Sequence, residues 1–148
     1  MDELDRKILN LLQTEFPVAS EPFRIVGERL GLSGEEVVAR VRRLRERGII
    51  RRIGATFDPR RLGYASTLCA AKVPEDLVGR FVETVNACPG VTHNYRRDHA
   101  YNIWFTLIAE SEEALERTLA EIAAKTGVRD ILSMKAARTF KIDASFKL

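Results

Sequence analysis

Residues 26–41, VGERLGLSGEEVVARV, decide the fold of the first part of the chain. Gly27 leaves room for two helices to approach each other, and Gly31 supplies the flexible residue that the turn between them requires. Val37 and Val41 lie one helical turn apart, so they face the same side of the following helix. This spacing predicts a helix-turn-helix, whose second helix is the recognition helix.

The sequence on either side extends the helix-turn-helix into a small domain. Apolar residues recur at helical spacing over residues 4–12, and Pro17 ends that helix. The third helix begins after Ser33, a capping residue, and Gly48 stops it. Residues 49–57 then predict a small β-wing.

Strands and helices alternate in the remainder of the chain. Strands are expected at 64–73, 91–97 and 100–108, with a last strand between 131 and 142. Helices are expected after Pro74 and after Ser111, and the order βαββαβ is the ferredoxin-like arrangement. The sequence thus predicts an α+β protein with a winged helix-turn-helix domain at 1–58, a linker at 59–63 and a ferredoxin-like domain at 64–148.

The composition indicates a soluble protein of the cytoplasm. Of the 148 residues, 45% are hydrophobic and 30% are charged, which is typical of a globular chain. Met1 leads directly into acidic residues, where a secretory leader would be basic and apolar. No apolar run approaches the roughly 20 residues that span a bilayer. Cys69 and Cys88 have no neighbouring ligands at zinc-site spacing, so we expect both to be reduced and to bind no metal.

The first domain carries the excess positive charge. Residues 1–62 contain 13 Lys or Arg against 10 Asp or Glu, whereas residues 63–148 contain 11 of each. A basic domain is a weak indication of nucleic-acid binding. However, a recognition helix presents its first residues to base edges, and Glu35 and Glu36 occupy those positions here. The sequence therefore disfavours DNA as a partner.

The densest group of reactive and aromatic side chains is HNYRRDHAYNIWF, residues 93–105. It contains both histidines, the only tryptophan and two of the three tyrosines. We expect two strands here, joined by a tight turn at Asp98-His99. Because side chains alternate along a strand, one face should carry Tyr101, Ile103, Phe105 and Leu107, and the other Asn102, Trp104 and Thr106.

These motifs resemble a known family. The helix-turn-helix followed by the βαββαβ tail is similar to the Lrp/AsnC regulators along the whole chain. HNYRR followed by YNIWFT resembles the siroheme decarboxylase branch of that family. The segments FPVASEPF (16–23), GIIRRIGATFD (48–58) and RTFKI (138–142) are similar to the same branch. The chain departs from the pattern before Arg138, where Met134-Lys135-Ala136-Ala137 replaces a Leu-Pro entry to the last strand.

The resemblance implies a reaction and a substrate. Members of this branch remove carbon dioxide from the acetate side chains at C12 and C18 of siroheme, an anionic iron tetrapyrrole, in haem or haem d1 biosynthesis. They need no cofactor beyond the iron of the substrate. Aromatic faces would hold the ring, and arginines would hold the rim carboxylates. The resemblance implies His93, Tyr95 and Arg96 as catalytic residues. It implies substrate binding by Arg97, His99, Tyr101, Asn102, Trp104, Arg138 and Lys141.

Several alternatives stay open at this point. His93 either donates a proton to the product carbon or ligates the substrate iron as an axial ligand. The resemblance implies a heterodimer with a homologous subunit, or else a homodimer, and the sheet needs cover on the face that lacks helices. A transcription regulator of the Lrp/AsnC kind with a small-molecule effector, and a non-catalytic tetrapyrrole-binding partner subunit, are the competing functions.

Overall fold

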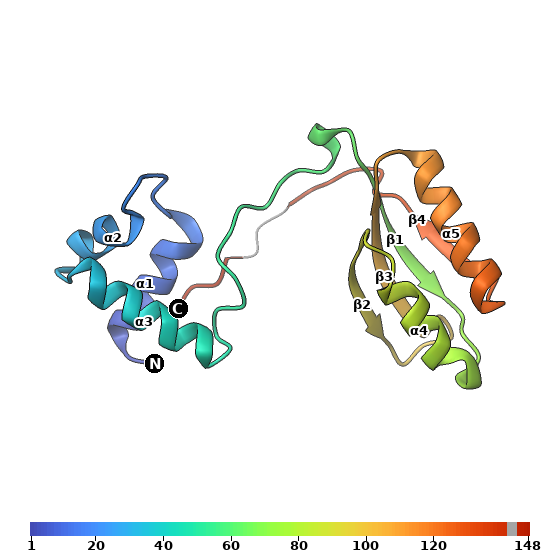
Figure 1. The fold of residues 1–148 in the computed structure, drawn as a ribbon, viewed down its shortest axis with the longest axis horizontal. Coiled ribbons are helices and arrows are strands. Elements are labelled where there is room, and N and C mark those ends of the chain that lie inside the picture. Colours follow the sequence, from blue (N-terminus) through green and yellow to red (C-terminus); the bar gives the residue numbers. More distant parts are fainter. Residues whose placement is uncertain (142–144) are drawn as a thin grey trace. The chain divides into compact units, whose positions relative to one another are not determined.

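The computed structural model describes residues 1–141 and 145–148, which form two compact units. The first unit, here called the head, is Met1–Ala55 with Lys141–Leu148. The second, the α/β unit, is Thr56–Phe140. The chain therefore passes from one unit to the other twice, once on each side of the α/β unit. Figure 1 labels the elements of both.

Three helices build the head: α1 (Glu3–Thr14), α2 (Pro22–Leu30) and α3 (Gly34–Glu46). The Ser33 hydroxyl caps α3 by accepting a hydrogen bond from the backbone N–H of Glu36 at 3.1 Å. Gly27 is required where α2 approaches the turn, because a Cβ there would lie 2.6 Å from the Leu32 carbonyl oxygen. The predicted helix-turn-helix is confirmed. Its buried core consists of Ile8, Leu9, Val26, Val37, Val41, Leu44 and Ile50.

The predicted β-wing is wrong. Residues 51–57 contain no strand, and all of them are exposed, including Ile53 and Phe57. An isolated two-stranded hairpin is only marginally stable in water unless one of its faces packs against something. Ile50 alone from residues 49–57 is buried in the head core. The head is therefore a helix-turn-helix without a wing at this position.

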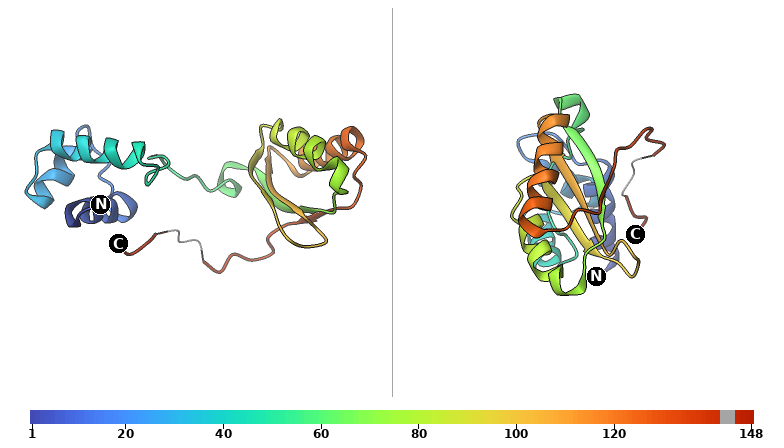
Figure 2. Two further views of the ribbon diagram at one scale, coloured as in Figure 1. Left: turned by 90° about the horizontal axis from the view of Figure 1, so that it is seen from below. Right: turned by 90° about the vertical axis from the view of Figure 1, so that its right-hand side faces the viewer.

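A four-stranded antiparallel sheet in the order β2-β3-β1-β4 forms the α/β unit. Two helices cover one of its faces, as Figures 1 and 2 show. In chain order the elements are β1 (Ala65–Ala71), α4 (Val78–Asn86), β2 (Val91–Arg96), β3 (Ile103–Ala109), α5 (Glu112–Thr126) and β4 (Ile131–Met134). This order confirms the predicted ferredoxin-like fold. None of the helices in the described parts of the chain is long and apolar enough to cross a membrane.

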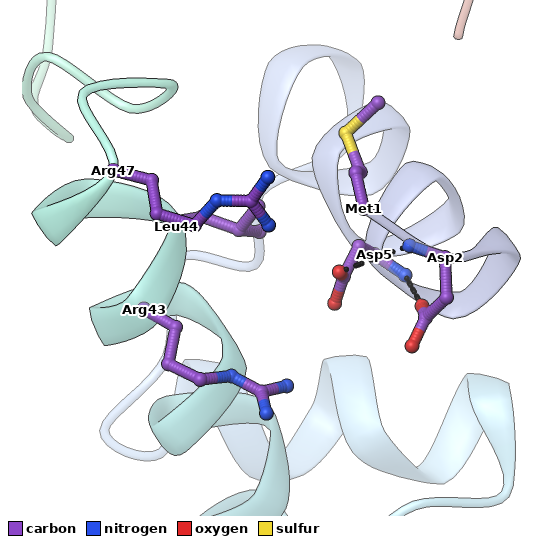
Figure 3. A pocket seen from close by; sticks show the side chains of 6 residues that line it. All are labelled: Met1, Asp2, Asp5, Arg43, Leu44 and Arg47. Carbon is purple, nitrogen blue, oxygen red and sulfur yellow. Dashed lines mark hydrogen bonds between the residues drawn. The ribbon is translucent and has the colours of Figure 1, made fainter.

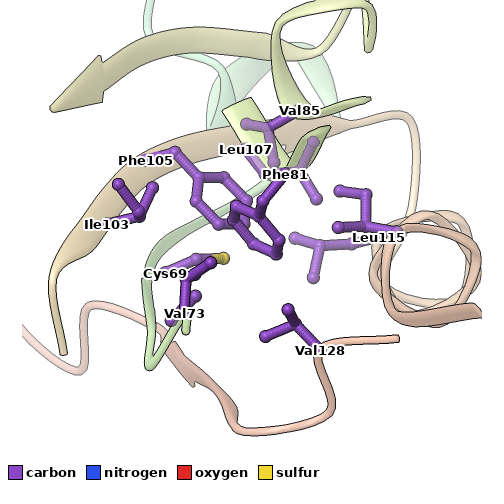
Figure 4. Close-up of a cluster of buried hydrophobic side chains, with 11 residues drawn as sticks. Cys69, Val73, Phe81, Val85, Ile103, Phe105, Leu107, Leu115 and Val128 are labelled. Carbon is purple, nitrogen blue, oxygen red and sulfur yellow. The ribbon is translucent and has the colours of Figure 1, made fainter. Parts of the chain in front are cut away.

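The hydrophobic core of the α/β unit lies between the sheet and its helices (Figure 4). Ile103, Phe105 and Leu107 of β3 are buried in this core. The rings of Phe105 and Phe81 (α4) pack edge to face, with their centroids 6.2 Å apart. Because strand residues alternate, Trp104 and Thr106 belong to the opposite face, which carries no helix. The predicted division of this strand into two faces is confirmed for residues within β3. We call the helix-free side of the sheet the open face.

The connection between β2 and β3 differs from the prediction. β3 begins at Ile103, not at residue 100, and residues 97–102 form a longer loop in place of a tight turn at Asp98-His99. The backbone N–H of Arg97 donates to the Asn102 carbonyl at 2.8 Å and closes this loop. Tyr101 and Asn102 therefore lie in the loop and not on the strand.

The last strand lies at the start of its predicted range, residues 131–142, and is short. β4 stops at Met134, so Arg138 and Lys141 do not lie on a strand. Beyond Met134 the Ala136 carbonyl accepts a hydrogen bond from Arg60 Nη2 at 2.9 Å, and no neighbouring strand pairs with it. The chain thus leaves the sheet before it reaches Arg138 and Lys141.

Candidate functional site

His93 and Tyr95 stand together on β2. A bulge between Val91 and His93 sets the register of this edge strand, which places His93 opposite Thr106 and Tyr95 opposite Trp104. Both side chains are exposed, and their rings stack with centroids 6.1 Å apart and planes inclined by 25°. The His93 Nδ1 atom lies 3.1 Å from the Thr92 hydroxyl. The open face therefore carries an imidazole and a phenol side by side, with neither enclosed.

Trp104 lies next to this pair and is held from two sides. Its indole N–H donates to the Tyr101 carbonyl oxygen at 2.7 Å, which fixes the orientation of the ring. The Arg97 guanidinium carbon lies 5.5 Å from the centroid of the indole, within the range of a cation–π contact. A flat aromatic surface and a cation thus meet at the end of the open face where β3 begins.

Aliphatic side chains continue the open face beyond Trp104. Ala70 of β1 is paired with Trp104 on one side and with Leu132 of β4 on the other. Leu68 is paired with both Thr106 and Met134. The larger aliphatic side chains are substantially exposed, at 43% for Leu68, 42% for Leu132 and 38% for Met134. The open face is therefore a broad apolar surface with His93 and Tyr95 at its edge.

The loop before β3 contains a polar network. The Tyr101 hydroxyl donates to Asp130 Oδ1 at 3.0 Å, and the His99 ring accepts a hydrogen bond from the Tyr101 N–H at 3.1 Å. The Asp130 carboxylate that accepts this bond raises the pKa of the Tyr101 hydroxyl above its usual value. Sequence reasoning missed Asp130, and its position just before the last strand would have been the signal. Tyr101 is thus bound through its hydroxyl, and its carbonyl positions Trp104.

Arg96 lies apart from His93 and Tyr95. It is paired with the core residue Ile103, so strand alternation directs it to the helix side of the sheet. There its Nη2 donates to both carboxylate oxygens of Glu75, at 3.0 and 2.9 Å. The structure therefore does not bring the three predicted catalytic residues to one place, because two share the open face and the third is bound on the other.

Both polar atoms of the Asn102 side chain form hydrogen bonds within the protein. Its Oδ1 accepts from the Val73 N–H and its Nδ2 donates to the Val73 carbonyl, both at 2.9 Å. Val73 follows β1 and is buried. This reciprocal pair ties the end of β1 to the start of β3, and it leaves the Asn102 amide engaged at both ends.

The two predicted cations near the C-terminus lie in different units. Arg138 belongs to the α/β unit, and its guanidinium carbon lies 4.9 Å from the centroid of the exposed Phe140 ring. Lys141 belongs to the head. Part of the last predicted strand, at residue 142, lies outside the described residues. Substrate binding by Arg138 and Lys141 stays a prediction.

The head contains a cavity of about 320 Å³ between the start of α1 and the end of α3 (Figure 3). Two carboxylates, from Asp2 and Asp5, and two guanidinium groups, from Arg43 and Arg47, line it together with Met1 and Leu44. The carboxylates are a poor environment for a polyanion such as a carboxylated macrocycle. Among the described residues no group of His, Cys, Asp and Glu is arranged to hold a metal ion. This cavity is therefore a poor match for such a substrate.

The sequence matches known families in both units. Residues 5–51 match the siroheme decarboxylase NirDL-like HTH domain, and residues 61–141 match the AsnC-like ligand binding domain. A siroheme decarboxylase alpha subunit from Desulfovibrio desulfuricans is 52% identical over 148 residues, which cover 100% of this chain and 85% of that protein. The chain belongs to the siroheme decarboxylase subunit family. The resemblance found in the sequence is therefore confirmed.

Solved structures of siroheme decarboxylases share this fold. The crystal structure of the siroheme decarboxylase NirDL matches with a TM-score of 0.76 and 36% identity, covering 98% of this chain and 47% of that chain. This chain thus spans about half the length of NirDL. A crystal structure of NirDL in complex with an iron-uroporphyrin III analogue matches with a TM-score of 0.74 and 35% identity, over 93% of this chain and 47% of that one.

Proposed function

We propose that this chain is a subunit of a siroheme decarboxylase, which converts siroheme to didecarboxysiroheme in haem or haem d1 biosynthesis. The observation that carries the proposal is the stacked pair of His93 and Tyr95 beside Trp104 on the open face. Membership of the siroheme decarboxylase family supports it, as does the complex of NirDL with an iron-uroporphyrin analogue. The iron of siroheme is part of the substrate, and the proposal requires no further cofactor.

The open face suits a flat macrocycle with an anionic rim. Trp104 and Tyr95 offer aromatic faces to the ring, and the neighbouring leucines exclude water from it. Arg97 already lies against Trp104, so a rim carboxylate next to the indole would meet a guanidinium. Arg96 is bound by Glu75 on the other side of β2, so it lies away from the ring.

Two acetate side chains lose carbon dioxide in this reaction. In each step the bond between the methylene carbon and the carboxylate carbon breaks, carbon dioxide leaves, and the electron pair is delocalised into the macrocycle. A proton then adds to the methylene carbon and gives a methyl group. An apolar, water-poor wall disfavours the carboxylate relative to the more dispersed charge of the transition state. His93 and Tyr95 are the groups on the open face that can deliver the proton.

A second subunit is required to enclose the substrate. Helices cover one side of the sheet, and the other side leaves Leu68, Leu132 and Met134 exposed. A macrocycle lying on this surface would still have one of its own faces in water. We therefore propose that a homologous decarboxylase subunit covers the open face and completes the pocket.

The decisive experiment is anaerobic turnover of siroheme. The purified chain is incubated with siroheme, alone and together with the homologous subunit, and the products are followed by mass spectrometry. We expect sequential loss of two molecules of carbon dioxide when the assembly is complete. If siroheme binds with a shifted visible spectrum but loses no mass even with the second subunit, the chain is a tetrapyrrole-binding partner and the proposal fails.

A further inference from the structure

Tyr101 is the residue through which the loop before β3 holds Trp104. Its carbonyl oxygen accepts the indole N–H of Trp104 at 2.7 Å, and its own N–H donates to His99 Nδ1 at 3.1 Å. The rings of His99 and Tyr101 also stack, with centroids 6.3 Å apart and planes inclined by 22°. The orientation of the indole therefore depends on where the backbone of Tyr101 lies.

Asp130 binds Tyr101 from outside this loop. Asp130 Oδ1 accepts a hydrogen bond from the Tyr101 hydroxyl at 3.0 Å, although the two residues are 29 positions apart in the sequence. The backbone of Asp130 is itself held, because its carbonyl oxygen accepts from the Lys72 N–H at 3.0 Å. Lys72 directly follows β1, and Asp130 directly precedes β4. The carboxylate is thus anchored at the end of the sheet.

A second contact ties the same loop to the end of β1. The Asn102 side-chain amide pairs with the backbone of Val73, and the Asn102 carbonyl accepts from the Arg97 N–H at 2.8 Å. Arg97 in turn lies against the indole, 5.5 Å from its centroid. A loop that is fixed at both Tyr101 and Asn102 samples fewer positions than a loop fixed at Asn102 alone. The hydroxyl bond of Tyr101 therefore restricts the indole and the guanidinium beside it.

We propose that Asp130 is a positioning residue of the decarboxylase, which acts through Tyr101 to hold the Trp104 indole in place for the substrate ring. This inference rests on the proposed function for its catalytic consequence, and on hydrogen bonds within the α/β unit for the connection from Asp130 to Trp104. Asp130 neither moves a proton nor binds the substrate. Its task is to orient an aromatic side chain that contacts the macrocycle.

Fluorescence of the full chain tests this connection without any substrate, because Trp104 is the only tryptophan. In Asp130→Ala we expect acrylamide to quench the indole more strongly than in the wild type, and the anisotropy to fall. Asp130→Asn should restore both signals, since an amide oxygen still accepts the Tyr101 hydroxyl. Asp98→Ala removes an exposed carboxylate from the same loop and is the matched control, which should leave both signals unchanged. Wild-type signals in Asp130→Ala would overturn the proposal.

A double-variant cycle with Tyr101→Phe shows whether Asp130 acts through the phenol. Tyr101→Phe removes the hydroxyl but keeps the backbone carbonyl that binds the indole. If Asp130 acts only through this hydroxyl, Asp130→Ala combined with Tyr101→Phe should quench no more strongly than Tyr101→Phe alone. Effects that add in the double variant would contradict the proposal, since Asp130 would then reach the indole by another route.

Steady-state turnover of the assembled enzyme tests the consequence. Asp130→Ala should raise the KM for siroheme by about three- to tenfold, the range that one lost hydrogen bond accounts for. The kcat should stay nearly unchanged, because no group that moves a proton is altered.

The other outcomes separate the positioning role from the proposed function. A carboxylate that only repels the anionic substrate would give a lower KM in Asp130→Ala and in Asp130→Asn, which would refute the positioning role. A loosened indole with an unchanged KM would refute it as well. A wild-type enzyme whose indole is held but which does not turn over siroheme would instead refute the proposed function.

Discussion

Glu75 binds Arg96 through both of its carboxylate oxygens, on the side of β2 opposite to His93 and Tyr95. Both partners are exposed, at 72% and 59% of their side-chain surface. An ion pair this exposed contributes about 1 kcal/mol or less to the free energy of unfolding. The ion pair matters more for orientation than for stability, because it holds the Arg96 guanidinium away from the open face, on which we place the substrate.

Arg96→Ala is therefore expected to leave catalysis largely intact. Without Arg96 the open face keeps its imidazole, phenol and indole, so kcat should fall by less than about tenfold, well below the ~10²–10⁴-fold contribution of a positioned acid. The measurement is single-turnover loss of carbon dioxide by the assembled enzyme. Glu75→Gln is the companion variant and should behave alike. A loss as large as that of a His93 variant would place Arg96 among the reacting groups.

His93→Gln should lower kcat strongly without unfolding the protein. The side chain is exposed, so the free energy of unfolding should change by about 0.5 kcal/mol or less. If His93 donates the proton, the chemical step slows by about 10²–10⁴-fold while siroheme still binds. If it ligates the iron instead, the visible spectrum of the bound siroheme shifts and turnover changes less.

Tyr95→Phe keeps the aromatic face and removes only the hydroxyl. We expect siroheme binding to persist, because the ring that would contact the macrocycle is unchanged. Turnover should fall if the hydroxyl shares in proton delivery. Tyr64→Phe is the matched control, because Tyr64 is exposed and immediately precedes β1 in the sequence. Equal turnover in the two variants would confine Tyr95 to packing against the substrate.

Periodic apolar residues could be read correctly from the sequence, whereas contacts between distant residues could not. The two faces of β3 follow from alternation alone, and the helix-turn-helix follows from the spacing of Gly27, Gly31 and Val37. The predicted wing is wrong because residues 51–57, although they have the composition of a strand, are all exposed and bury no apolar face. Local patterns predict an element only where tertiary contacts complete it.

The candidate catalytic residues do not share one face of the sheet, which the sequence did not reveal. His93, Tyr95 and Arg96 are neighbours in the sequence, yet strand alternation separates the last from the other two. Glu75, the residue that binds Arg96, is 21 positions away. The bulge beside His93 that sets the register has no sequence signature of its own. Adjacency in the sequence therefore did not show which of these side chains share a face of the sheet.

Asn102→Ala should destabilise the α/β unit. The substitution leaves the buried Val73 N–H and carbonyl without the partners that Asn102 supplies at 2.9 Å. Leaving such groups unsatisfied costs about 1–3 kcal/mol, which denaturant unfolding of the purified chain would measure. Asn94→Ala is the control, since its amide donates a hydrogen bond to the exposed side chain of Asn86 and to no buried backbone group. Loss of siroheme binding at unchanged stability would instead assign Asn102 to the substrate.

The Tyr101–Asp130 hydrogen bond predicts a pH dependence at high pH. Asp130 raises the pKa of the Tyr101 hydroxyl, so the folded protein prefers the protonated phenol. The stabilisation is complete below the ordinary tyrosine pKa of 10.0 and is lost as the pH rises through the raised value. In Asp130→Asn the ultraviolet titration of this tyrosine should move to lower pH. Tyr101→Phe should remove one step from the wild-type curve and so identify the step of this tyrosine, and an identical position of that step in Asp130→Asn and the wild type would contradict the contact.

Cys69 should resist alkylation in the folded protein. Its side chain is fully buried in the core between the sheet and the helices (Figure 4), and burial raises the pKa of its thiol to about 12 from 9.0. Because the thiolate is the nucleophile, the reactive fraction at pH 8 is about a thousandfold smaller than for an ordinary thiol. Mass spectrometry after brief treatment with iodoacetamide should find Cys69 unmodified and the half-buried Cys88 modified slowly. Denaturant should make both react, and rapid labelling of Cys69 without denaturant would show that the core opens at the β1 strand.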